Sequence, residues 1–244
     1  MDVYWLEQTE ADVPKEDSWL SAREVICLSG MHFVKRRTDW RLGRWTAKQA
    51  LAACLHVPNH LSALAEIEVR AAPSGAPEVF VANQPAAFTV SLSHRAGLAA
   101  CAVARTPVDL GCDLETIEPH GQAFVTDYFT AEEQLRIAQA SAADQPRLVA
   151  LLWSGKESTL KALRTGLRLD TRSVVVNPGG TSLHVSGWHP LQVRYADAQA
   201  FHGWWRYSDS FLRTVVAAPP PSPPIFLRVP DRIGSAAPFL EPVT

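Results

Sequence analysis

The chain has 244 residues, enough for one large domain or two small ones. Its 23 Lys and Arg residues nearly balance its 25 Asp and Glu residues, which gives a formal net charge of −2. This balance argues against a protein held on nucleic acid or on a membrane by its overall charge. No apolar run reaches the about 18 residues that span a bilayer, and the N-terminus lacks the pattern of a signal peptide. We therefore expect a cytoplasmic protein that binds neither nucleic acid nor membranes.

The first half of the chain, residues 1–107, is predicted to be an α+β unit. The segment from about His32 to Leu55 is rich in Ala and ends before Pro58, which indicates a long helix. Short apolar or alternating runs bounded by turn residues are typical of strands. We predict four of them, at residues 66–70, 79–81, 88–93 and 98–104.

The second half, residues 108–218, repeats this order loosely, although no strong sequence repeat accompanies it. Thr130 followed by Glu133 is a capping-box start for a helix, and residues 147–163 predict a second long helix. We predict four strands here, at residues 108–114, 174–176, 191–195 and 211–217. The order predicts an α+β protein with two similar, packed subdomains.

The last segment, residues 219–244, differs in composition, because it holds 8 of the 18 prolines. Such a composition does not sustain a helix or a central strand. We expect a Pro-rich tail that is extended over the surface or partly disordered.

Two carboxylates follow an apolar run in the segment Gly111-Cys112-Asp113-Leu114-Glu115. Residues two apart on a strand face the same side, so Asp113 and Glu115 are expected on one face. Paired carboxylates repel unless a cation or a proton lies between them, and Mg²⁺ suits oxygen ligands. From this segment alone, two solvated charges at the end of a strand are the favoured interpretation.

A second polar cluster lies in Trp153-Ser154-Gly155-Lys156-Glu157-Ser158, followed by Lys161. On a helix, Trp153, Glu157 and Lys161 share one stripe, so Glu157 is a candidate third metal ligand with Lys161 one turn further on. An exposed Glu–Lys pair is the alternative interpretation.

A basic stripe and a polar turn complete the set of candidates. The stripe lies on the first predicted helix, where Arg gives bidentate phosphate contacts; a solvated helix face is the alternative. Its members are Lys35, Arg36, Arg37, Arg41, Arg44 and Lys48. The turn is Ser91-Leu92-Ser93-His94, whose hydroxyls and imidazole suit an anion; a capped turn is the alternative interpretation.

Together, the Ser-His turn, the Asp113 segment and the Trp153–Lys161 segment resemble the 4′-phosphopantetheinyl transferase family. The similarity is to the surfactin-synthetase type, in which two similar halves form a pseudo-dimer within one chain. It runs from about Ser21 to Ala217, and Gly43–Lys48 is similar to the family's helix before the first loop.

The resemblance implies two α+β halves, with coenzyme A in the cleft between them and Mg²⁺ held by Asp113, Glu115 and Glu157. It implies that the enzyme moves the 4′-phosphopantetheine arm of coenzyme A to a serine of an acyl, peptidyl or aryl carrier protein and releases 3′,5′-ADP. We expect a monomer whose partners are coenzyme A and apo carrier domains.

Individual roles follow from the same resemblance. The expected catalytic residues are Asp113, Glu157 and Lys161, and the candidate bases are Glu157, a metal-bound water and Glu133. The residues expected to bind coenzyme A are Arg37, Arg44, Ser93, His94 and Lys161, with Arg36 as an alternative to Arg37.

One departure from the family concerns the loop Gly75-Ala76-Pro77, where members usually have Gly-Lys-Pro. A contact to the nucleotide is therefore missing or supplied elsewhere, for example by Arg70. Two other functions stay open: a coenzyme A-binding module without transfer, and a Mg²⁺-dependent pyrophosphate hydrolase.

Overall fold

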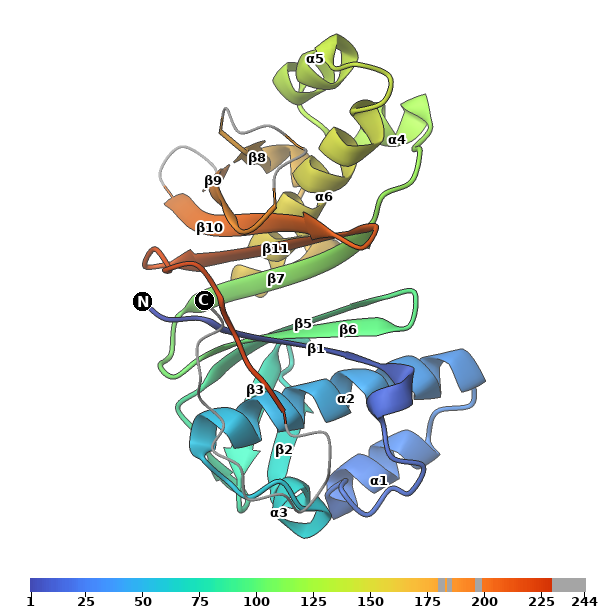
Figure 1. Ribbon diagram of the computed structural model, residues 1–244, viewed down its shortest axis with the longest axis vertical. Helices are drawn as coiled ribbons and strands as arrows, with labels where there is room; N and C mark the ends of the chain where they lie inside the picture. Colours follow the sequence, from blue (N-terminus) through green and yellow to red (C-terminus); the bar gives the residue numbers. More distant parts are fainter. Residues whose placement is uncertain (180–182, 184–185, 196–198, 230–244) are drawn as a thin grey trace. The chain divides into compact units, whose positions relative to one another are not determined.

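The computed structural model describes residues 1–179, 183, 186–195 and 199–229 (Figure 1). The chain divides into two compact units, and the division falls between Pro107 and Val108. The N-terminal unit comprises Asp2–Pro107 and the segment that begins at Ile225, and the C-terminal unit comprises Met1 and Val108–Pro224. Both units combine helices with strands, so the predicted α+β class is confirmed.

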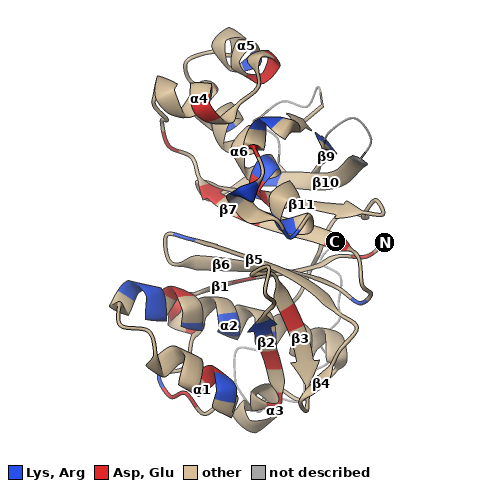
Figure 2. Cartoon of the chain, turned by 180° about the vertical axis from the view of Figure 1, so that it is seen from behind, with Lys and Arg blue, Asp and Glu red and all other residues tan. Residues whose placement is uncertain are grey.

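The N-terminal unit contains a long helix, two short helices and two sheets. Its elements are β1 Tyr4–Thr9, η1 Glu10–Asp12, α1 Ala22–Ser29, α2 Val34–Leu55, α3 Leu61–Ala65, β2 Ile67–Ala71, β3 Pro77–Val81, β4 Gln84–Pro85, β5 Thr89–Arg95, β6 Leu98–Ala104 and β12 Ile225–Phe226. One sheet has the strand order β12-β1-β6-β5 and the other β2-β3-β4. Helix α2 packs on β1, β2, β5 and β6, and basic residues gather in its first half (Figure 2).

Helix α2 confirms the long helix predicted for this half. Its central residues are helix formers whose small side chains let the helix lie close to the sheet, and Ala50, Leu51 and Ala52 are fully buried. The helix ends at His56, which adopts a left-handed conformation with φ 56°. Pro58 follows, as expected for a residue that cannot continue a helix.

The described part of the Pro-rich segment is extended and paired with β1. The amides of Ile225 and Leu227 donate to the carbonyls of Val3 and Trp5, at 2.9 and 2.8 Å. Strand β12 runs parallel to β1 at the edge of its sheet, where prolines nearby do not interrupt a ladder. Leu227 is 6% exposed and belongs to the core of the N-terminal unit. Residues 230–244 of the predicted tail lie outside the described residues.

The C-terminal unit places one long helix across a five-stranded sheet of order β7-β11-β10-β9-β8. Its elements are β7 Asp109–Thr116, α4 Gln122–Tyr128, α5 Ala131–Gln139, α6 Gln145–Ala162, η2 Gly166–Arg168, η3 Thr171–Ser173, β8 Val174–Asn177, β9 His189–Tyr195, β10 Gln199–Ser208 and β11 Phe211–Ala218. Helix α6 packs on β7, β8, β9 and β11. Within the described residues, no helix combines the length and the hydropathy needed to cross a membrane.

Four strands have no counterpart among those predicted from the sequence: β1, β4, β10 and β12. Strand β10 pairs with β9 and β11 as a central strand, although its first half carries polar residues and a glycine. The glycine is required by packing, because a Cβ on Gly203 would lie 1.9 Å from the Val215 carbonyl oxygen. The glycine that makes this segment look unlike a strand in the sequence is thus the residue that lets the backbones of β10 and β11 lie close together.

Candidate active site

Helix α6 lies unusually close to strand β7, and this contact builds the candidate site. A Cβ placed on Gly111 would lie 1.7 Å from the backbone oxygen of Ser158 and 2.7 Å from the backbone nitrogen of Ala162. Only glycine fits this position. Gly111, Asp113 and Glu115 share one strand face, so the approach brings the Asp113 carboxylate to the helix.

The Asp113 carboxylate is shared between two residues of α6. Its Oδ1 lies 2.8 Å from Lys161 Nζ, and its Oδ2 accepts a hydrogen bond of 2.9 Å from Ser154 Oγ. Lys161 Nζ also donates to the Cys112 carbonyl at 3.0 Å. Asp113 is buried, whereas the Lys161 side chain is 28% exposed.

A chain of buried hydroxyl groups is hydrogen-bonded to Asp113 through Ser154. Thr214, the residue that pairs with Asp113 on β11, has its Oγ1 2.8 Å from Ser154 Oγ and 2.7 Å from Ser158 Oγ. All three residues are fully buried. Satisfied buried hydrogen bonds of this kind hold side chains in one orientation, so Asp113 is fixed relative to α6.

Glu157 is half-buried on α6, close enough to Asp113 for their charges to interact. Burial raises the pKa of Glu157, the negative charge of Asp113 raises it further, and Lys161 opposes both. Burial alone would lower the pKa of Lys161, but Asp113, Cys112 and Glu157 outweigh it and the net pKa is raised. Negative charge is thus crowded at this site, and one lysine offsets part of it.

The three predicted metal ligands are therefore only partly assembled. Asp113 and Glu157 are brought together, and Glu115 shares the strand face of Asp113 and is half-exposed. In the part of the chain that the structure describes, no group of three or more His, Cys, Asp or Glu side chains is set to hold a metal. The fit to Mg²⁺ rests on the donor chemistry, because carboxylate oxygens are the ligands this ion prefers.

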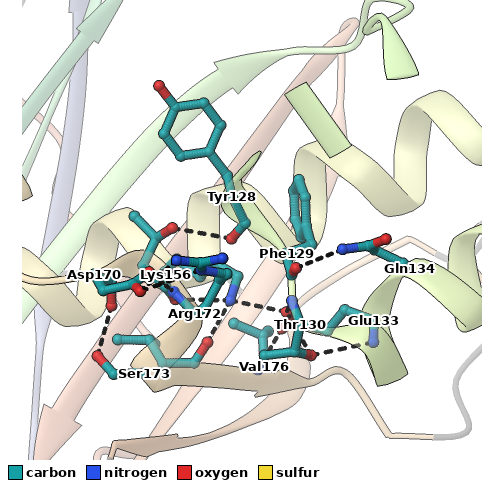
Figure 3. Close-up of polar contacts among 12 residues, drawn as sticks. Tyr128, Phe129, Thr130, Glu133, Gln134, Lys156, Asp170, Arg172, Ser173 and Val176 are labelled. Atoms are coloured by element: carbon teal, nitrogen blue, oxygen red, sulfur yellow. Dashed lines mark hydrogen bonds and ion pairs between the residues drawn. The ribbon is translucent and has the colours of Figure 1, made fainter. Parts of the chain in front are cut away.

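Glu133, the second candidate base, is occupied by structural contacts (Figure 3). Its side chain is 2% exposed and forms a 2.8 Å ion pair with Lys156. Its Oε2 accepts hydrogen bonds from Thr130, and its Oε1 accepts one from the amide of Val176. Because both oxygens are engaged and buried, Glu133 is not placed to take a proton from a substrate.

A separate pocket of about 470 Å³ lies in the N-terminal unit, and its lining is basic and aromatic. It is lined by Phe33, Lys35, Arg36, Asp39, Trp40 and His94. The His94 side chain is 53% exposed, with Nε2 3.8 Å from Asp39 Oδ2, and Lys35 forms a 2.6 Å ion pair with the same carboxylate. Cations beside aromatic rings suit a phosphorylated nucleotide.

Most of the predicted basic stripe is used inside the unit. Arg37 donates to the Leu28 and Met31 carbonyls at 2.8 and 3.3 Å, which joins α1 to α2. Arg44 stacks over Trp40, 5.0 Å from the ring centroid, and burial lowers its pKa. Neither arginine lines the pocket, whereas Arg36 does.

The remaining expectations concern Ser93 and the loop around Ala76. Ser93 lies on β5 one residue before His94 and is buried, 8% exposed. Arg70 forms an ion pair with Glu68 and stacks 3.7 Å from the Phe80 ring centroid. Arg70 is therefore already engaged within its own sheet.

The sequence prediction missed the two buried lysines Lys48 and Lys156, which form ion pairs with Glu24 and Glu133. A signal was present, because Trp45-Thr46-Ala47-Lys48 and Trp153-Ser154-Gly155-Lys156 are a short internal repeat. Each lysine follows a Ser or Thr capping box that contains its glutamate.

Comparison with known proteins bears on the C-terminal unit. Residues 109–215 match the family model of the 4′-phosphopantetheinyl transferase superfamily, a segment that runs from β7 into β11 and contains Asp113, Glu157 and Lys161. A search of curated proteins returned no match. The family match supports the resemblance carried by the sequence motifs, and it indicates a transferase of the phosphopantetheinyl class.

Proposed function

We propose that this protein transfers the 4′-phosphopantetheine arm of coenzyme A to a serine of an apo carrier domain. One observation carries the proposal: the segment that matches the family model holds Asp113, Glu157 and Lys161 together across the contact between β7 and α6. This cluster combines acidic oxygens with a lysine ammonium group, which suits a charged pyrophosphate substrate.

The bonds made and broken in this reaction balance without another reactant. The serine oxygen forms a bond to the phosphorus on the pantetheine side of the pyrophosphate. The bond from that phosphorus to the bridging oxygen breaks, and 3′,5′-ADP leaves with the electron pair. The hydroxyl proton goes to a base, for which we propose Glu157, acting directly or through a bound water molecule.

Lys161 is proposed to contact the pyrophosphate, where negative charge develops on the leaving group. Its raised pKa keeps it charged at neutral pH. Asp113, Glu115 and Glu157 are the proposed ligands of Mg²⁺, which when bound offsets the charge of the pyrophosphate oxygens. The crowded negative charge at Asp113 and Glu157 supports a cation at this position.

We propose that the pocket of the N-terminal unit binds the nucleotide end of coenzyme A. His94 and Arg36 are the candidates for the 3′-phosphate, since both line the pocket. Ser93 remains a candidate beside His94. Arg37 and Arg44 would have to leave their present carbonyl and aromatic partners to contribute.

The test is intact-mass analysis of a panel of apo carrier proteins incubated with coenzyme A and Mg²⁺. We expect at least one carrier to gain one phosphopantetheine group, and Asp113→Asn to abolish the gain while the protein stays folded. Asp209→Asn is the matched control, because Asp209 is exposed in the β10–β11 turn at φ 53°, a conformation that Asn tolerates.

Each alternative function predicts a different result in the same assay. Release of 3′,5′-ADP without any carrier would indicate a hydrolase. Binding of coenzyme A with no turnover on any carrier would indicate a binding module. Full activity of Asp113→Asn, or full activity in the presence of a chelator, would contradict the proposed metal site.

A further inference from the structure

Glu133 and Lys156 form a buried ion pair in the C-terminal unit (Figure 3), and Lys156 directly precedes Glu157 on α6. Lys156 has no exposed surface, and its Nζ lies 2.8 Å from Glu133 Oε2. The same Nζ donates to the carbonyl of Thr171 at 2.9 Å and to the carbonyl of Val174. Three acceptors therefore fix the end of this side chain.

Glu133 connects the pair to the surrounding elements. It closes the capping box of α5 with Thr130, and it also accepts the amide of Val176 in β8 at 3.0 Å. One carboxylate thus joins α5, α6 and β8. The position of Lys156 on α6 is set relative to the sheet by these contacts.

The N-terminal unit contains a matching pair. Lys48 is fully buried on α2, 2.5 Å from Glu24 Oε2, and its Nζ donates to the carbonyls of Trp19 and Leu64 at 2.9 and 3.1 Å. Glu24 closes the capping box of α1 and accepts the amide of Val69 in β2 at 3.3 Å. The two pairs therefore join equivalent elements: a capped short helix, a long helix and a strand.

The likeness extends to the residues around each lysine. Lys48 Nζ lies 5.7 Å from the ring centroid of Trp19, and Lys156 Nζ lies 5.6 Å from that of Phe129. Both lysines come three residues after a tryptophan, at Trp45 and Trp153.

The residue that follows each lysine differs in charge. Gln49 follows Lys48, is fully buried and donates to Asn59 Oδ1 at 3.0 Å. Glu157 follows Lys156 and is half-buried near Asp113. At equivalent places on their long helices, one unit thus presents the neutral Gln49, paired with Asn59, and the other presents the carboxyl group of Glu157.

A buried ion pair contributes little net stability compared with a well-packed apolar pair, because desolvation of both charges offsets their attraction. It does impose directional contacts, which fix orientation. Adjacent residues of an α-helix point about 100° apart around its axis, since a turn takes 3.6 residues. Fixing the orientation of Lys156 therefore also fixes the direction in which the Glu157 side chain points from α6.

We propose that Glu133 and Lys156 are positioning residues that hold α6 in the rotation that directs Glu157 toward Asp113. Glu24 and Lys48 hold α2 in the same manner. The residue after Lys48 is Gln49 rather than a carboxylate, so the orientation of α2 does not affect metal binding. The inference rests on the proposed function, because it assigns Glu157 to the metal. It gives the buried Glu133 a role that requires no contact with the substrate.

The experiment compares two double variants that each replace a charged pair by neutral side chains of similar size. Glu133→Gln with Lys156→Met tests the proposal, and Glu24→Gln with Lys48→Met is the matched control. Gln retains a capping-box acceptor in both. Mn²⁺ is the probe, and its binding to the full chain is measured by electron paramagnetic resonance without coenzyme A or carrier. Thermal unfolding is recorded for each variant.

We expect both double variants to lose similar thermal stability. Only Glu133→Gln/Lys156→Met should weaken Mn²⁺ binding, by about tenfold or more, the usual effect of losing a residue that positions a metal ligand. Equal Mn²⁺ affinity in the two double variants would overturn the positioning role. If either double variant fails to fold, the single variants Glu133→Asp and Glu24→Asp, which keep both charges and shorten the carboxylate arm by one methylene, give the same comparison.

Failure of the proposed function has a different signature. Wild-type protein that binds no Mn²⁺ and modifies no carrier would overturn the metal assignment and the inference with it. Wild-type protein that binds Mn²⁺, together with unaltered binding in Glu133→Gln/Lys156→Met, would overturn the inference alone.

Discussion

Gly111→Ala is expected to separate α6 from β7 and so disrupt the candidate active site. The added Cβ would lie 1.7 Å from the Ser158 backbone oxygen, about half of the 3.4–4 Å of an ordinary contact. The atom that it meets is helix backbone, which cannot rotate away as a side chain would. The helix must shift as a body.

The size of the effect follows from this geometry. Overpacking a well-packed interior costs about 1–3 kcal/mol, and a backbone obstacle favours the upper end of that range. For a protein of this size, a loss of about 3 kcal/mol lowers Tm by about 6–12 °C. Lys161 Nζ lies 2.8 Å from Asp113 Oδ1. A shift of α6 would lengthen this distance, so transfer activity should fall as well.

The assay is thermal unfolding followed by circular dichroism, together with carrier modification measured by mass at a temperature where the variant is folded. Gly43→Ala is the control, because Gly43 lies inside α2 and a Cβ there would meet nothing within 4 Å. Ala is the better helix former, so this change should stabilise the protein by about 0.5–1 kcal/mol. Gly111→Ala is therefore expected to lower Tm, and Gly43→Ala is expected to raise it.

The reasoning would be refuted by a Gly111→Ala protein with wild-type Tm and wild-type kcat. That result would mean that α6 and β7 are not in close contact in solution. A lowered Tm with normal kcat would separate the two effects and show that Lys161 and Asp113 tolerate the shift.

Three further changes test other parts of the structure. Glu157→Gln should abolish transfer and, in the absence of divalent ions, raise Tm at pH 7. Folding raises the pKa of Glu157, so its ionised form destabilises the folded protein at pH 7 and its protonated form does not. The gain in Tm should therefore shrink as pH falls toward 4.5, and a lower Tm at pH 7 would contradict the argument. His94→Ala should raise KM for coenzyme A about tenfold or more, by loss of one charge-assisted contact, but not KM for dephospho-coenzyme A; equal effects on both would exclude contact with the 3′-phosphate. Truncation after Ala218 removes β12 and the buried Leu227 from the N-terminal unit. Tm should therefore fall by several degrees while kcat is unchanged. An unchanged Tm would show that this segment does not stabilise the N-terminal unit.

The long helices were predictable from the sequence, because their signals are local. Residues 32–55 are rich in helix formers and precede Pro58, and residues 147–163 contain no breaker except Gly155. The helices α2 and α6 lie at Val34–Leu55 and Gln145–Ala162. The common face of Asp113 and Glu115 was also predictable, since alternation is a property of any strand. The motif order indicated the superfamily, which the family match supports.

The tertiary structure decided what each charged residue does, because burial and partners arise from segments far apart in the chain. Arg37 and Lys48 belong to a stripe that looks uniform in sequence, yet one joins two helices and the other lies in the core. Glu133 reads as a candidate base until its two oxygens are seen to hold Lys156 and the Val176 amide. Asp113 meets Lys161 because Gly111 lets a helix that begins more than thirty residues later approach the strand. Such contacts leave no periodic pattern in the sequence, and only the packed fold brings their partners together.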